Sequence, residues 1–489
     1  MKDSFRQSMA FLHGWAGLIP GWLLYAVFLT GSLTYYRQEI TQWMRPELTG
    51  VTADPSAVPH ALAWLGEHGQ GATLWRIDLP TPRTPVTEVL WKGDGGFASQ
   101  LLDPRTGGPL RVRETMGGDF LFYFHFDLNA PGSGGRWLVC FAAIIMLVAL
   151  ISGIVTHRRI FADFFTFRPR KGQRSWLDAH NVAGVAALPY HLLISFTGLV
   201  ALMTMFMPWG IDKAFSGNVS AFRSALAEQT PITFPAGPRA PLRIDAMLTD
   251  ARSHWHGSAP GRILVEHPGT ADALTTIERA DRDSISYDLA WRRYRADGAL
   301  IDAHDNSGPA VAAYQWLYGF HLARFSSEAM RFLFFASGLL ATAMIATGLI
   351  LWVKKRAARE DSAENLAARI NVAVIAGLPI GVASLLTANR LIPSDFAGRA
   401  SLEGAAFFLA WLIMLVHALC VRPARAWRQQ GVVLGILCLA TPFIPIEPTG
   451  IGLLAWIARG NAAPLMVDGA LLAAGLLSLS VSLFRPQRA

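Results

Sequence analysis

The sequence predicts an α-helical polytopic membrane protein that carries two α+β domains in its long loops. Three observations support this fold class. Hydrophobic residues make up 52% and charged residues only 16% of the 489 residues, whereas soluble domains carry about 25% charge. The mean hydropathy is positive, at +0.32. The apolar residues collect in about eight runs, each close to the roughly 20 residues that a helix needs to cross a bilayer.

The predicted spans differ in how clearly they are bounded. They cover residues 11–35, 137–156, 181–207, 330–353, 370–387, 404–421, 431–446 and 465–484. The seventh is the weakest, because Pro442 and Pro445 interrupt it. The first does not have the pattern of a cleaved signal peptide, because its apolar run is too long and no small-residue cleavage site follows it.

Lysine and arginine residues predict the orientation of the spans. They cluster before the first span, between the second and third, after the fourth, after the sixth, and at the end of the chain. Their members are Lys2, Arg6, Arg158, Arg159, Arg168, Arg170, Lys171, Arg174, Lys354, Lys355, Arg356, Arg359, Arg422, Arg425, Arg428, Arg485 and Arg488. With eight spans, all these clusters and both termini lie on one side, which we expect to be cytoplasmic. The net charge of +8 is therefore interpreted as a topology signal and not as a nucleic-acid-binding patch.

The two long loops are predicted to be folded domains on the other side of the membrane. Each begins with a helix-like segment, at 57–66 or 243–254, and continues with alternating, strand-like segments. Both contain too many aromatic and branched residues for disorder. The predicted organisation is a first span (1–36), a first outer domain (37–136), two spans with a basic loop (137–208), a second outer domain (209–324), a fourth span (325–358) and a four-span extension (359–489). We expect few buried polar groups in that extension.

The first four spans form an internal repeat. The matched positions are His13 with His180, Gly17 with Gly184, Thr30-Gly31 with Thr197-Gly198, and Phe124-His125 with Phe320-His321. Each half is therefore a span, an outer domain, a histidine and a second span. Because both halves enter from the same side, they are expected to be related by an axis along the membrane normal.

Six of the 13 histidines are predicted to form two layers. His13, His157 and His180 lie at the cytoplasmic ends of spans, His125 and His321 lie just outside the second and fourth spans, and His191 lies inside the third. On a straight helix, His180 and His191 would share one face about 16 Å apart. Imidazole is a common axial ligand of haem iron, and ionisable residues inside a membrane are usually functional. Two layers of imidazoles in a four-helix core therefore predict two b-type haems, with nearby glycines admitting the flat macrocycle.

Each of these residues also has another interpretation. Interfacial histidines such as His13 and His157 are often solvated, and a hydrogen bond inside the core would also explain His191. A mononuclear metal site would need clustered carboxylates or short histidine spacings that the sequence lacks. The repeat favours haem, because the paired histidines recur in register. His417 in the sixth span is isolated and is interpreted as structural. The absence of Cys-x-x-Cys-His excludes covalent c-type attachment.

Several short motifs between residues 5 and 358 resemble those of one known family. They are Leu12-His13-x-x-x-Gly17, Asp103-Pro104-x-Thr106-Gly107, Ser152-Gly153 through His157-Arg158-Arg159, Ser175-Trp176-Leu177-Asp178-Ala179-His180-Asn181, Leu188-Pro189-Tyr190-His191 and Tyr318-Gly319-Phe320-His321. Together they resemble the PepSY-associated transmembrane family, which includes inner-membrane siderophore-iron reductases. The resemblance implies two periplasmic PepSY-like domains, a bacterial inner-membrane location and, in reductase members, haem in the four-span core.

The resemblance also implies a set of ligands. The matching histidines are His13, His125, His157, His180, His191 and His321. Two haems need four axial ligands, so the pairing stays open. We prefer His180 and His191 first, then His13 or His157 on the inside and His321 or His125 on the outside.

The predicted function is transmembrane electron transfer by an oxidoreductase. Electrons from a cytoplasmic reductant or quinol would reach a periplasmic acceptor, such as a ferric siderophore or another ferric chelate. No GxGxxG pattern is present, so NAD(P)H or flavin would belong to a partner. The run Arg292, Arg293 and Arg295 is either a docking site for an anionic chelate or a solvated charge run. The alternative function is a non-redox membrane protein whose PepSY domains bind peptides, regulate a peptidase or assist transport.

Overall fold

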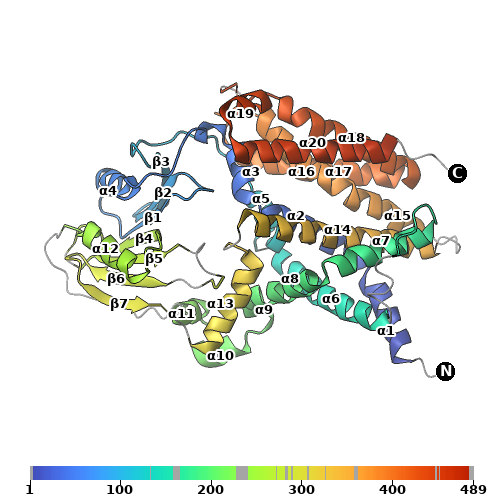
Figure 1. Cartoon of the computed structure of the whole chain (residues 1–489), viewed down its shortest axis with the longest axis horizontal. Coiled ribbons are helices and arrows are strands. Elements are labelled where there is room, and N and C mark those ends of the chain that lie inside the picture. Colours follow the sequence, from blue (N-terminus) through green and yellow to red (C-terminus); the bar gives the residue numbers. More distant parts are fainter. Residues whose placement is uncertain are drawn as a thin grey trace. The chain divides into compact units, whose positions relative to one another are not determined.

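The computed structural model consists of two compact units (Figure 1). It describes residues 4–132, 134–157, 166–226, 241–270, 272–280, 285–287, 290–305, 308–324, 327–356, 362–446, 449–450 and 452–483. The helical unit comprises Met1–Pro46, Arg113–Leu199 and Glu328–Ala489, and the sheet unit comprises Glu47–Val112 and Val200–Ser327. Some basic residues used to predict the topology lie outside the described residues, namely Lys2, Arg158, Arg159, Arg359, Arg485 and Arg488.

The helical unit is built from long apolar helices, because an apolar segment in lipid can satisfy its backbone hydrogen bonds only within itself. Its helices are α1 (Phe5–Ala16), α2 (Ile19–Thr34), α3 (Arg37–Met44), α5 (Asp119–Asp127), α6 (Gly135–Thr156), α7 (Gln173–Ala186), α8 (Leu188–Ala201), α14 (Glu328–Arg356), α15 (Ser362–Ile375), α16 (Gly377–Leu391), α17 (Arg399–Cys420), α18 (Pro423–Ala440), α19 (Leu453–Arg459) and α20 (Ala462–Leu483). Helix α14 packs against both α2 and α7, and α18 packs along α20 (Figure 1).

Among the described residues, five helical stretches are long and apolar enough to cross a membrane. They are Gly135–Thr156, Glu328–Arg356, Leu366–Leu391, Arg399–Cys420 and Ala462–Leu483. The bent pairs α1–α2 and α7–α8 raise the number to as many as seven, if each pair is one span. The seventh predicted span falls on α18, which is not in this set and begins with a polar stretch that contains Arg425 and Arg428. The chain is therefore a multi-pass membrane protein, and the eight-span topology stays a prediction.

The third predicted span is not one continuous helix. Helix α7 ends at Ala186 and α8 begins at Leu188, with a bend of 69° between them. Pro189 explains the break, because it has no N–H to donate to the carbonyl of Val185 and its ring would collide with that carbonyl. The shared face predicted for His180 and His191 assumed a straight helix, and that prediction is wrong.

The sheet unit contains one antiparallel sheet of seven strands in the order β3-β2-β1-β4-β5-β6-β7. The strands are β1 (Leu74–Asp78), β2 (Thr87–Gly93), β3 (Gly96–Leu102), β4 (Pro260–Glu266), β5 (Leu274–Arg279), β6 (Trp291–Arg295) and β7 (Leu300–His304). Strand β1 pairs with β4 from Leu74↔Glu266 to Asp78↔Arg262. The two outer domains expected from the sequence are thus halves of a single sheet. Residues 37–46 and 113–136, expected in the first outer domain, belong to the helical unit.

One face of the sheet is covered by helices α4 (Ala57–His68) and α12 (Ile244–His254). Alternation along the strands directs Ile77, Ile263 and Ile277 into a fully buried core with Leu65 of α4 and Met247 of α12. Charged side chains of the central strands, including Arg76, Asp78 and Arg262, point the other way. The remaining helices of this unit are α9 (Met203–Phe206), α10 (Trp209–Phe215), α11 (Val219–Leu226) and α13 (Pro309–Leu322).

Candidate functional site

Two of the predicted histidines meet in the helical unit. His13 lies in the last turn of α1 and His180 lies in the middle of α7, with ring centroids 6.2 Å apart and ring planes inclined by 66°. Each ring is held by a second helix. Nδ1 of His13 lies 2.9 Å from the carbonyl oxygen of Ala149 in α6, and Nδ1 of His180 lies 2.8 Å from that of Met344 in α14.

These hydrogen bonds decide which ring nitrogen is available to a ligand. A carbonyl oxygen can only accept, so Nδ1 carries the proton, and in the neutral ring the lone pair is on Nε2. In the described part of the chain, no hydrogen bond reaches Nε2 of His13 or His180. Metal-binding histidines typically donate their other N–H to a carbonyl in this way. With metal–nitrogen bonds of about 2.0–2.1 Å, two imidazoles on opposite sides of one metal atom would have centroids roughly 6 Å apart, which is close to the separation of this pair.

A glycine lies against each of the two rings. A β-carbon added to Gly153 would lie 3.1 Å from Cε1 of His13, and one added to Gly348 would lie 3.1 Å from Cε1 of His180. In each case the carbonyl that binds the ring belongs to the residue four positions before the glycine, which is about one helical turn. The bare backbone thus lets the ring approach the helix closely enough to reach that carbonyl.

His125 is held by the same arrangement on α2. It lies in the last turn of α5, and its Nδ1 is 2.8 Å from the carbonyl oxygen of Val27. Gly31, four residues after Val27, would bring an added β-carbon within 2.6 Å of the ring. We expected glycines to admit a macrocycle, but Gly31, Gly153 and Gly348 instead contact histidine rings. The three carbonyls were missed from the sequence, although a glycine one turn later marks each of them.

His191 is fully buried in α8, with 0% of its surface exposed. Neither of its ring nitrogens has a hydrogen-bonding partner within the described residues. The backbone carbonyls of Gly184 and Ser337 lie near the ring without completing a hydrogen bond. The hydroxyl group of Ser195, one turn along α8, is also buried without a partner. An unbonded buried imidazole is costly, so His191 and Ser195 leave unsatisfied polar atoms inside the helical unit.

The histidines of the helical unit lie at two depths along α14. His180 bonds to Met344, whereas Ser337, whose carbonyl lies near His191, comes seven residues earlier in the same helix. At 1.5 Å per residue the two depths are about 10 Å apart.

The remaining predicted histidines are placed differently. His157 follows the last residue of α6. His321 lies in the last turn of α13, in the sheet unit. His417 bonds through its two ring nitrogens to Gln429 and Gln430, as expected of a structural residue.

The arginine run of β6 is mostly buried, so Arg292 and Arg293 form neither an exposed docking site nor a solvated charge run. Arg292 and Arg293 are each only 6% exposed. Arg292 donates to Asp250 of α12 at 3.0 Å, and the guanidinium group of Arg293 lies over the ring of Trp291. Strand alternation sends these two side chains to opposite faces of the sheet. Of the run, Arg295 is exposed.

Residues 359–489, the predicted four-span extension, contain many buried polar groups, so the expectation of few such groups is wrong. The buried polar residues among its described positions are Asn371, Asn389, Arg390, Arg399, Glu403, Gln430, Thr441 and Asp468. The three guanidinium nitrogens of Arg390 have no hydrogen-bonding partner within the described residues. Its guanidinium carbon lies 3.5 Å from the ring centroid of Trp43, whose Nε1 donates to Asp468. Average hydropathy conceals single polar residues of this kind among apolar neighbours.

The fold and the site define a multi-pass helical membrane protein with histidines held between its helices and one antiparallel sheet in its long loops. Comparison with protein families shows a match to the PepSY-associated TM region over residues 10–355. The chain belongs to this family, which confirms the resemblance seen in its motifs. An uncharacterized protein of Pseudomonas aeruginosa is 28% identical over 382 residues, covering 73% of this chain and 92% of the relative. The family match ends within α14, so the predicted four-span extension lies outside it.

Proposed function

We propose that this chain is a haem-binding electron-transfer protein of a bacterial inner membrane. The His13–His180 pair carries the proposal. Two helices present imidazoles 6.2 Å apart, and each ring is already oriented by a carbonyl. Bis-histidine ligation of a b-type haem requires two neutral rings with available Nε2 atoms, and this pair fits that requirement.

A second haem is proposed at the depth of His191. That imidazole is buried and has no hydrogen-bonding partner among the described residues. Its fellow ligand in this proposal is His125 of the same unit, which is oriented by Val27.

Haem iron, when bound, supplies one-electron redox chemistry. The residues of the chain hold the rings in place. The carbonyls of Ala149 and Met344 fix the tautomer and make Nε2 more basic. Gly153 and Gly348 let the rings lie directly against α6 and α14.

We further propose that electrons pass from a cytoplasmic reductant or quinol to a ferric siderophore or another ferric chelate in the periplasm. The basic clusters indicate which side is cytoplasmic, and a cytoplasmic reductant would donate its electrons from that side. Reduction to Fe(II) weakens the hold of hard oxygen ligands and releases the metal. In this proposal, the sheet unit docks the chelate and the chain acts as a ferric reductase.

The spectrum of the purified full-length protein tests the proposal. Protein from haem-replete cells should be red, its dithionite-reduced minus oxidised spectrum should show b-type bands, and pyridine haemochrome should give about two haems per chain. A colourless preparation would refute the proposal. It would favour the alternative, a non-redox membrane protein that binds peptides, regulates a peptidase or assists transport.

Single substitutions test the ligands. His180→Ala and His191→Ala should each lose one haem, because each removes an axial imidazole. His417→Ala should keep both, because its ring bonds only to glutamine side chains. If His191→Ala keeps both haems while remaining folded, the second site is assigned wrongly.

A further inference from the structure

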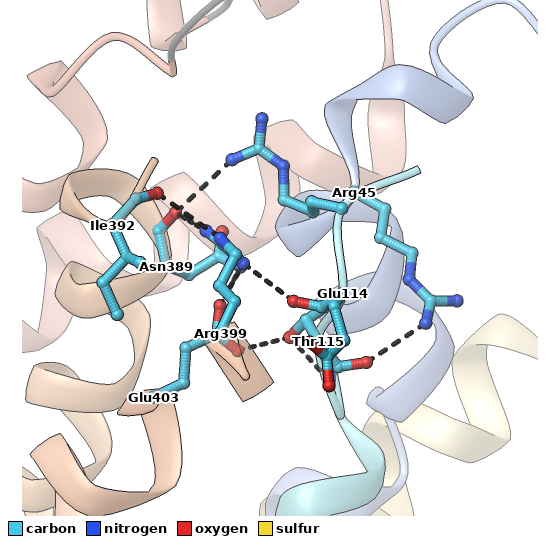
Figure 2. A network of polar contacts seen from close by, with 9 residues as sticks. Arg45, Glu114, Thr115, Asn389, Ile392, Arg399 and Glu403 are labelled. Atoms are coloured by element: carbon cyan, nitrogen blue, oxygen red, sulfur yellow. Dashed lines mark hydrogen bonds and ion pairs between the residues drawn. The ribbon is translucent and has the colours of Figure 1, made fainter. Parts of the chain in front are cut away.

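The segment that leads into α5 is held by helices α16 and α17 of the predicted four-span extension (Figure 2). The hydroxyl group of Thr115 donates to Glu403 of α17. Arg399, one turn before Glu403, donates to that carboxylate and to the backbone carbonyl of Glu114. Asn389 of α16 donates to Glu403 at 2.8 Å. We call these five residues the α5 clamp.

The charged centre of the α5 clamp is removed from water. Arg399 is 0% and Glu403 is 1% exposed, and Asn389 and Thr115 are also buried. Buried ion pairs are seldom more stabilising than well-packed apolar residues, but breaking one by removing a partner is costly. We therefore interpret the clamp as a device that specifies one position of the chain at residues 114–115.

The same threonine fixes the first turn of α5. Oγ1 of Thr115 accepts a hydrogen bond from the backbone N–H of Gly117 at 3.0 Å, and the N–H of Gly118 donates to Thr41 at 3.0 Å. Gly117 has a φ of 59°, a conformation that favours glycine. A β-carbon on Gly118 would lie 2.2 Å from the carbonyl oxygen of Arg37. The start of α5 is therefore held by hydrogen bonds to two threonines, Thr115 and Thr41.

Helix α5 transmits this position to His125. The buried rings of Phe120 and Phe124 lie 4.9 and 5.1 Å from that of Phe407 in α17. His125 follows Phe124 directly, and its Nδ1 bonds to the carbonyl of Val27 in α2. A shift of α5 against α17 would therefore change the hydrogen bond that orients the ring.

We propose that the four-span extension positions His125 through the α5 clamp. Glu403 and Arg399 are positioning residues in this view: they hold Thr115, Thr115 holds the start of α5, and α5 holds the imidazole against α2. A partner that orients a ligating imidazole also tunes the metal it binds. The redox part of this inference rests on the proposed function with His125 as a ligand, whereas the mechanical part does not.

Thr115→Val in the full-length protein provides the test, because it keeps the shape of the side chain and removes the hydroxyl group. Amides of α5, residues 119–127, should exchange hydrogen roughly tenfold faster, since Glu403 and the N–H of Gly117 lose a partner. The haem bound by His125 should show a changed electron paramagnetic resonance signal and midpoint potential, while the other haem stays unchanged. Thr115→Ser should restore both readouts, and His417→Ala should change neither.

Each other outcome decides a separate part of the inference. Unchanged exchange in α5 would overturn the clamp. Faster exchange with both haem signals as in the wild type would overturn the link to His125. If Thr115→Val does not fold, Phe407→Leu loosens the same helix from the apolar side and must accelerate the same amides. A colourless wild-type protein would refute the proposed function and with it the redox part, while hydrogen exchange would still decide the clamp.

Discussion

Gly31→Ala is expected to displace His125 from α2. The added β-carbon would lie 2.6 Å from Nδ1 and Cε1 of the ring, whereas ordinary carbon contacts begin at about 3.5 Å. The ring must therefore move back by about 0.9 Å. Its hydrogen bond to Val27 is now 2.8 Å long and would be stretched beyond about 3.5 Å, where little of it remains.

The energetic cost of Gly31→Ala follows from three contributions. Overpacking a tight contact costs about 1–3 kcal/mol, and leaving the buried N–H of His125 unbonded costs about 1–3 kcal/mol. Replacing a helical glycine by alanine stabilises the helix by about 0.5–1 kcal/mol, which offsets part of this cost. We therefore expect a net loss of about 3 kcal/mol around α2 and α5.

Hydrogen exchange of α2 and α5, together with haem content, measures this loss. Gly153→Ala should have a smaller effect on its own histidine, because the gap there is 3.1 Å and the ring need move only about 0.4 Å. Gly14→Ala is the matched control, because an added β-carbon would meet nothing within 4 Å. If Gly31→Ala proves as stable as Gly14→Ala, the reasoning that glycine seats the ring is refuted.

Two further predictions concern carboxylates. Asp178→Asn should loosen the start of α7 by about 1–3 kcal/mol, because Asp178 accepts three hydrogen bonds from Arg168 at 2.8–3.0 Å. Thermal unfolding would show this as a lowered Tm, and an unchanged Tm would contradict it. Burial raises the pKa of Glu278 despite the nearby charge of Arg262. The contribution of the protonated Glu278 carboxyl group to the stability of the sheet is therefore fully present below the ordinary carboxyl pKa. That contribution is lost as pH rises through the raised pKa of the folded state. Glu278→Gln cannot titrate, so the exchange of β5 amides, corrected for intrinsic rates, should lose that pH dependence. If Glu278→Gln keeps the wild-type pH dependence of β5 amide exchange, Glu278 is not the group that causes it.

The internal repeat was the most informative feature of the sequence for the candidate site. It matched His13 with His180, and the structure brings these two rings together. Register along the chain reveals such pairs, because equivalent positions in two similar halves lie at similar depths. The partner of His180 in its hydrogen bond, Met344, was not predictable in the same way, because a backbone carbonyl leaves no side-chain signature.

Features that depend on long-range contacts were not predictable from composition or spacing. Arg399 and Glu403 are one helical turn apart, a pattern usual for an exposed ion pair, yet both are buried. The pairing of β1 with β4 depends on a register such as Trp75↔Val265, and these residues also fit two separate small sheets. Pro189 is a helix-breaking signal in the sequence. The prediction of one continuous third span gave more weight to the length of the apolar run.

The central pairing of the sheet has a consequence for the synthesis of the protein. Strand β1 ends at Asp78 and its partner β4 begins at Pro260, with α6, α7 and α8 in between. At about 5–20 residues per second, the ribosome needs on the order of 10–40 s to make the second strand after the first. During that interval one edge of β1 has no native partner and is open to wrong ones. The nascent chain thus passes through a stage in which membrane insertion must run ahead of sheet closure, and a slowed ribosome or a delayed insertion would raise the yield of mispaired protein without changing the finished fold.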